Sequence, residues 1–236
     1  MPAPEQMTLQ QIVDVADVDL RAFLESEIRS ARLTPGEGRE LLLATLPGWA
    51  EPYENASATV AADLYDQKRF AYGIDAVVPY KPGLAPNVEA ARWGILASWA
   101  LAPVVEEVDW DSAFQKIVGG AHRTIADAHR NTTMANSVAD PASRGWQRVG
   151  RGGKTCAFCR MLIGRGDVYD SITVQFKSHD NCRCAAESVF DGDIIKAAEF
   201  ADYGGSGRKR TRTDRDRQNT REWLRAAEGS SMMPDL

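Results

Sequence analysis

The residues best suited to chemistry in this chain are its cysteines, because all four lie in one short window. The segment CAFCRMLIGRGDVYDSITVQFKSHDNCRC, residues 156–184, also holds one of the three histidines. Two close pairs of soft ligands separated by a loop of this length can converge on one tetrahedral zinc ion. In a reducing cytoplasm, clustered thiols are more often metal ligands than disulfides. The spacing therefore predicts a zinc site.

Five candidate ligands compete for the four places around such an ion. The pattern is C-x2-C-x19-H-x2-C-x-C, and its first two ligands are Cys156 and Cys159. The other two come from His179, Cys182 and Cys184. Because a C-x-C pair would make a tight bite on one metal, we favour His179 with Cys182 and treat Cys184 as the alternative ligand. Two disulfides, or four reduced cysteines acting as small buried hydrophobic residues, are the alternatives to a metal.

The same residue pattern favours a structural ion over a catalytic one. A catalytic zinc keeps one position open for water, whereas this segment offers enough soft ligands to close the coordination shell. The deaminase signature is absent, because Asn181 stands where that motif needs a glutamate after its histidine. His122 and His129 are predicted on one helix about 10.5 Å apart along its axis, too far to share an ion, so we interpret them as a solvated helix face.

No nucleotide-binding or hydrolase motif supplies an alternative chemistry. The sequence has no P-loop, no GxSxG and no dinucleotide fingerprint. We therefore expect a non-enzymatic protein with no catalytic residues and no small-molecule substrate.

Residues 1–143 are predicted to form a helical body that positions the cysteine segment. Apolar residues at spacings of three and four define one face of a first helix: Leu9, Ile12, Val13, Ala16, Leu20, Phe23, Leu24 and Ile28. Thr34 followed by Pro35 is typical of a helix start. We expect Pro47 and Pro52 to interrupt this second helix, which resumes over residues 54–73. The small residues of its alanine-rich part, residues 58–65, would let a neighbouring helix approach, and its exposed side is a candidate docking surface.

The remainder of the body is predicted as a loop and two further helices. Residues 79–87, PYKPGLAPN, contain three prolines and cannot form a regular element. Helices are expected over residues 88–102 and 109–140. The second of these is weakened by Gly119 and Gly120 and ends near Asp140, which precedes a proline.

Residues 144–203 are predicted as a small β-rich module stapled by zinc, so the fold class is α+β. Short strands are expected at residues 145–149, 170–176 and 187–190, followed by a helix at residues 193–203. The cysteine-bearing part has few large apolar residues, and a module so small needs a staple.

Residues 204–236 are predicted as a flexible basic tail behind a GGSG hinge. Between residues 208 and 225, eight basic residues stand against three acidic ones, a net charge of +5 in a chain whose total is −5. This imbalance suggests a polyanionic partner or an acidic protein surface. The candidate nucleic-acid contacts are Arg208, Lys209, Arg210, Arg212, Arg215 and Arg217.

The composition is that of an ordinary globular protein. The 236 residues are 44% hydrophobic and 26% charged. No apolar run is long enough to span a bilayer, and the first residues have no basic or apolar leader segment. We expect synthesis in a cytoplasm and no membrane partner.

The quoted motifs resemble those of a known family. HDNCRC, residues 179–184, matches the H-x-N-C-R-C ending of the Mu F-like minor head proteins of tailed bacteriophages. CAFCRMLIGRGDVYDS, PYENASATVAADLYDQKR, HRTIADAHRNT and GWQRV are similar to the cysteine turn, the two helices and the strand of one subgroup. The resemblance spans roughly residues 50–190.

The resemblance implies a role in head assembly. It implies a non-enzymatic protein made in the host bacterial cytoplasm and packaged in the phage head near the portal. The expected partners are the portal or major capsid protein, and packaged DNA through the basic tail. The competing hypothesis is a zinc-containing DNA-binding regulatory protein that uses the zinc module and the tail directly.

Overall fold

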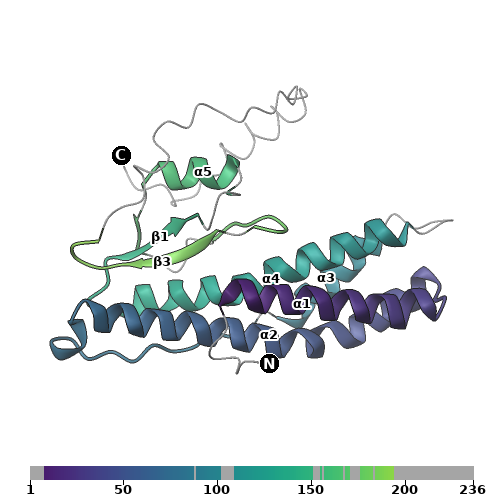
Figure 1. Cartoon of the computed structure of the whole chain (residues 1–236), viewed down its shortest axis with the longest axis horizontal. Helices are drawn as coiled ribbons and strands as arrows, with labels where there is room; N and C mark the ends of the chain where they lie inside the picture. Colours follow the sequence, from purple (N-terminus) through teal and green to yellow (C-terminus); the bar gives the residue numbers. More distant parts are fainter. Residues whose placement is uncertain are drawn as a thin grey trace. The chain divides into compact units, whose positions relative to one another are not determined.

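The computed structural model places most of the helical body and most of the cysteine segment (Figure 1). It describes residues 8–87, 89–101, 109–150, 155, 157–166, 168–170, 176–182 and 184–193. The chain divides into two units, residues 1–203 and 204–236, and every described residue belongs to the first. The basic tail lies outside the described residues, as does the helix predicted over residues 193–203 apart from its first residue.

The first helix, α1 (Leu9–Leu24), begins with a capping box. The hydroxyl of Thr8 accepts a hydrogen bond from the Gln11 N–H, and the Gln11 side chain accepts one from the Thr8 N–H. A π-helical turn, η2 (Glu25–Ser30), continues α1 directly. The buried side chains recur at every fourth position, which confirms the predicted apolar face: Ile12, Ala16, Leu20, Leu24 and Ile28.

The second helix, α2 (Pro35–Ala71), is continuous, so the prediction that its prolines interrupt it is wrong. It begins at the predicted Thr34, which forms a second capping box with Glu37. Pro47 and Pro52 both lie inside it. Each proline removes a backbone donor and crowds the preceding turn. The helical spacing of fully buried side chains nevertheless continues past Pro47, at Leu42, Leu46 and Ala50. We attribute the continuity to this packing, which offsets the local cost.

The alanine-rich part of α2 packs mainly in the core, and Asp63 and Leu64 are its exposed residues, so a docking surface on that exposed side stays a prediction. Ala58, Ala61 and Tyr65 are all buried. In the same region the hydroxyl of Ser57 donates to the backbone oxygen of Ile125, 2.8 Å away in the helix α4 (Trp110–Ala139). The small side chains thus serve close packing between α2 and α4.

The segment after α2 contains one short 3-10 helix, η3 (Ile74–Ala76), and the predicted loop over residues 79–87 is confirmed. Asn136 of α4 holds this loop. Its side-chain amide donates to the Gly83 oxygen at 2.9 Å and accepts from the Gly83 N–H at 2.8 Å. Next to this segment, the fully buried Arg69 and Asp140 form an ion pair.

Two helices complete the body: α3 (Ala90–Leu101) and α4 (Trp110–Ala139). As predicted, α4 ends near Asp140, which is its C-cap residue and stands just before a proline. Gly120 does not interrupt α4. A Cβ atom at this position would lie 2.2 Å from Cδ1 of Leu96, so the glycine permits the close approach of α3. Helix α4 contacts α1, α2, α3 and the sheet, which makes it the central element of this unit.

The second part of the unit is a small antiparallel sheet with one helix. Its strands are β1 (Gly145–Val149), β2 (Val168–Tyr169) and β3 (Ala185–Val189), in the order β2-β1-β3. Trp146 of β1 pairs with Tyr169 on one side and Ser188 on the other. The α+β prediction is therefore confirmed as a mostly helical fold with a small sheet.

Two local predictions in this part differ from the structure. The strand expected over residues 170–176 has its ends, Asp170 and Phe176, outside any strand, and residues 171–175 lie outside the described ones. The residues after the first cysteine form a helix, α5 (Ala157–Gly164), which was not predicted. Among the helices that the structure describes, none combines the length and hydropathy needed to cross a bilayer.

Candidate metal centre

Three cysteine side chains lie close together and buried beside the small sheet and α5. Cys159 comes from α5, while Cys182 and Cys184 come from the segment that leads into β3. Their Sγ atoms all lie within 4.8 Å of one another, and those of Cys159 and Cys182 are 3.5 Å apart. Around a tetrahedral zinc with bonds of about 2.3 Å, sulfur atoms are about 3.8 Å apart. None of these three cysteines forms a disulfide with another described residue, and this group can hold a metal ion with small adjustments.

The remaining predicted ligands are placed differently. Cys156 lies outside the described residues, directly before α5. His179 is exposed, and its Nδ1 lies 2.7 Å from the backbone oxygen of Asp180. His179 is not part of the group of side chains that could share a metal ion. The geometry thus favours Cys184 over His179, the reverse of the preference drawn from spacing.

The physical reason lies in the backbone before β3. In an extended chain, residues two positions apart point to the same side. Cys182 and Cys184 are two positions apart, just before β3 begins, and both sulfur atoms belong to the same group. Asn181, with a φ of +59°, forms a turn between His179 and Cys182.

The thiols lie in a hydrophobic cluster. The relative exposures of Cys159, Cys182 and Cys184 are 0%, 7% and 2%. The cluster also takes side chains from α4, α5, the strands and the segment before the histidine: Met134, Trp146, Ile163, Phe176 and Ala186. The module therefore has no core separate from the helical body, since Met134 of α4 is part of it.

A buried arginine of α4 contacts the cysteine segment through its backbone. Arg130 Nε donates to the carbonyl oxygen of Cys184 at 2.9 Å, and Nη2 donates to that of Cys182 at 2.8 Å. Its third nitrogen, Nη1, donates to Asp127 Oδ1 at 2.6 Å. Arg130 is fully buried. All three guanidinium nitrogens are thus used, two of them on the candidate ligands.

A second buried arginine approaches from the sheet. Nη1 of Arg148 lies 3.8 Å from Cys159 Sγ, and its Nη2 donates to the backbone oxygen of Lys177 at 3.0 Å. The guanidinium groups of Arg148 and Arg130 lie 3.6 and 4.8 Å from the centre of the Phe176 ring. Two cations beside the cluster would offset the negative charge of thiolates if the cysteines held a metal.

The close thiols also alter one another's acidity. Hydrogen bonds from Cys159 and Cys184 hold the pKa of Cys182 below its ordinary value, while hydrogen bonding to Cys182 raises the pKa of Cys159. For Cys184, hydrogen bonding with Cys159 lowers the pKa. The hydrogen bond to Cys182 and burial outweigh this effect and raise the pKa to about 12. A cation bound here would replace the protons of the thiols that hold it.

The turn before Cys182 packs against α4, at a histidine that also contacts α1. His122 Nδ1 lies 3.1 Å from Asn181 Oδ1, and His122 Nε2 lies 3.0 Å from Asp17 Oδ1 of α1. Gly119 leaves room for this turn, because a Cβ atom there would lie 3.1 Å from Asn181 Nδ2. His122 is half-buried, and His129 is buried with 2% exposure, so the predicted solvated histidine face is wrong.

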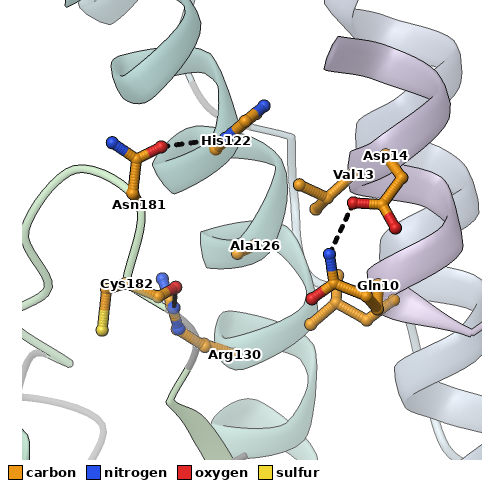
Figure 2. Close-up of a pocket in the computed structure, with 9 residues that line it drawn as sticks. Gln10, Val13, Asp14, His122, Ala126, Arg130, Asn181 and Cys182 are labelled. Carbon is orange, nitrogen blue, oxygen red and sulfur yellow. Dashed lines mark hydrogen bonds between the residues drawn. The ribbon is translucent and has the colours of Figure 1, made fainter. Parts of the chain in front are cut away.

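A pocket of about 340 Å³ opens between α1, α4 and this turn (Figure 2). Its lining includes Gln10, Asp14, His122, Arg130 and Cys182. Figure 2 shows the carbonyl of Cys182 facing Arg130 while its sulfur points away from α4. The pocket and the thiol cluster thus lie on opposite sides of the same backbone segment.

Sequence reasoning missed Arg130, Asp127 and Arg148. The first two form an i,i+3 pair on a helix, a pattern that is usually a solvated ion pair. Here the pair is buried because the cysteine segment, more than 50 residues later, covers it. Nothing in the local sequence indicates that cover.

Comparison with known proteins assigns the family. The family described as VG15 protein matches residues 4–204. This chain belongs to the VG15 protein family. The Gene 15 protein of Mycobacterium phage L5 is 31% identical to it over 144 residues, which are 57% of this chain and 46% of that protein. The Gene 15 protein of Mycobacterium phage D29 is 30% identical over 162 residues, which are 64% of this chain and 54% of that protein.

The VG15 chain spans about half the length of these curated relatives. No solved structure matches it. The matched region, residues 4–204, includes the helical body, the sheet and all four cysteines. The thiol cluster is therefore within the part of the chain that the family covers.

Proposed function

We propose that this VG15 chain is a minor head protein of a tailed bacteriophage, acting in head assembly without catalysing a reaction and holding one structural zinc ion. The observation that carries the proposal is the burial of three converging thiols in a core cluster shared with α4. A metal held there would join α5 to the segment before β3. It would stabilise the fold and meet no substrate.

The ligand set that fits best is Cys156, Cys159, Cys182 and Cys184. Three of these sulfur atoms already converge, and Cys156 precedes α5 by one residue, in a C-x2-C pair with Cys159. Soft thiolate ligands suit zinc, and four of them close its coordination shell. The ion would supply a cross-link, and Arg130 and Arg148 would offset the excess negative charge of the thiolates.

The head assignment rests on the family and on the motif. The similar curated proteins come from two mycobacteriophages. The HDNCRC segment, which resembles the ending of Mu F-like minor head proteins, is the part of the chain that α4 holds in place. On this basis the protein lies inside the phage head near the portal, and contacts the portal or major capsid protein. Its basic residues 208–217 contact packaged DNA.

The assembly role is tested on purified particles of the phage or induced prophage that encodes the chain. Quantitative mass spectrometry should find the protein at a fixed low ratio to the portal protein. Particles made without its gene should be fewer or less infectious. Absence from particles, together with sequence-preferring DNA binding by the purified protein, would replace this proposal with the DNA-binding regulator.

The zinc is tested separately on the purified, reduced full chain. Native mass spectrometry and elemental analysis should give one zinc per chain, and a chelator should expose residues 157–193 to protease. A metal-free protein whose protease resistance is indifferent to chelator would show that the thiols are ordinary core residues.

A further inference from the structure

Arg130 links the two cysteines that flank residue 183 to the centre of α4. Its guanidinium donates to both of their carbonyl oxygens, at 2.8 and 2.9 Å, in a fork that a planar side chain holds with fixed spacing. Because both acceptors are backbone atoms, these contacts fix the path of the chain itself. The direction in which the two thiols leave the backbone follows from that path.

Asp127 orients this guanidinium. Its Oδ1 accepts from Arg130 at 2.6 Å and from the Ser178 hydroxyl at 3.1 Å, while its Oδ2 pairs with Arg92 of α3 at 2.6 Å. Ser178 lies in the same segment as the cysteines, four residues before Cys182. The carboxylate therefore connects α3, α4 and the cysteine segment at one point.

We propose that Arg130 is a positioning residue for the metal centre: it presets the Cys182 and Cys184 thiols from the far side of their backbone, before any ion binds. This inference rests on the proposed zinc site. Its consequence is that α4, which supplies no ligand, is part of the metal centre, and that the cysteine segment is not an autonomous zinc module. Residues that orient metal ligands typically change affinity by about 10- to 100-fold when they are replaced.

The experiment measures metal affinity in the full-length, reduced protein. Co²⁺ is titrated into each variant, and Zn²⁺ affinity is then obtained by competition with a chromophoric chelator. The dissociation constant of Arg130→Gln should rise about 10- to 100-fold, because the glutamine cannot bridge both carbonyl oxygens. The dissociation constant of Arg130→Lys should lie between those of the wild type and Arg130→Gln, because lysine keeps the positive charge but cannot donate to both carbonyl oxygens in the arginine geometry.

Arg123→Gln is the matched control. It removes a cation from the same helix, seven residues from Arg130, and breaks a 3.0 Å ion pair with Asp180 of the same turn. Both partners of that pair are about one-third exposed, and such pairs contribute little. Its metal affinity should stay close to that of the wild type.

A merely structural role for Arg130 predicts a different result. All affinities are measured well below the thermal midpoint of each variant, with folding checked by circular dichroism. A lower midpoint for Arg130→Gln with an unchanged dissociation constant would overturn the proposal and leave the zinc site standing. Failure of the wild type to bind either metal would overturn the zinc site and this inference together.

Asp127→Asn provides the test if Arg130→Gln does not fold. It keeps both carbonyl contacts of Arg130 and weakens the group that orients it, together with that group's contacts to Arg92 and Ser178. We expect a smaller rise in the dissociation constant, with a shifted Co²⁺ d–d spectrum that reports altered ligand geometry. An unchanged affinity and an unchanged spectrum would refute the positioning role.

Discussion

The choice between Cys184 and His179 as metal ligands gives the sharpest test of the site. In the structure, Cys184 has its sulfur within 4.8 Å of two other thiols, whereas the His179 ring is exposed beside the backbone of Asp180. We therefore expect Cys184→Ser to weaken metal binding strongly and His179→Ala to leave it nearly unchanged.

The size of the effect follows from the number of ligands. Structural zinc binding provides about 10–16 kcal/mol in small domains, so four equal ligands contribute about 2.5–4 kcal/mol each. Loss of one should raise the dissociation constant by roughly 10²- to 10³-fold. The wild-type cluster needs little rearrangement on binding, because the 3.5 Å Sγ separation of Cys159 and Cys182 is close to the spacing around zinc. The full ligand contribution should therefore be seen.

The assay is Co²⁺ substitution followed by chelator competition, carried out on reduced full-length protein. The sulfur-to-cobalt charge-transfer absorption reports how many thiolates bind, so it should fall for Cys184→Ser and remain for His179→Ala. Cys159→Ser serves as the positive control, since Cys159 is a ligand in both schemes. If His179→Ala lost the metal while Cys184→Ser kept it, the geometric argument would be refuted and the preference drawn from spacing restored.

Three further predictions concern the scaffold, each measured by denaturant unfolding of the full chain. Gly120→Ala should lower the free energy of unfolding by about 1 kcal/mol, because the new methyl group crowds Leu96 of α3 by more than the gain in helix propensity offsets. Gly48→Ala, whose methyl group would meet nothing within 4 Å, should raise it by up to about 1 kcal/mol. Equal gains in the two variants would contradict this reasoning. Asp140→Asn should cost about 3 kcal/mol, because the buried Arg69 loses its buried partner and keeps the pair with the more exposed Asp75, and a loss under 1 kcal/mol would refute that reasoning. Burial, which raises the pKa of Asp193, is outweighed by hydrogen bonds to its carboxylate, so that pKa lies below its ordinary value. The stabilisation that ionised Asp193 provides is present at neutral pH and is lost as the pH falls below about 4. The difference in unfolding free energy between wild type and Asp193→Asn should therefore shrink in acid. A difference that stays constant from neutral to acid pH would contradict the assignment.

Local chemistry accounts for the parts of this fold that the sequence predicted correctly. The helix starts at Thr8 and Thr34 depend on residues within one turn, and the buried face of α1 follows from side chains at a helical period. The loop over residues 79–87 follows from its prolines. The clustering of all four cysteines is likewise visible in the sequence, and three of their thiols lie together in the structure.

Contacts between distant segments decided the rest. Pro47 is tolerated inside α2 because of packing on other helices, and Gly120 is required by a leucine on α3. The convergence of Cys184 with Cys159 depends on the position of β3, which begins directly after Cys184 and is set by pairing with β1. Arg130 donates two hydrogen bonds to the cysteine segment only because residues 52 and 54 positions later bring their carbonyl oxygens to its guanidinium. Local patterns describe what a residue can do, but the partner that uses it is brought there by the tertiary fold.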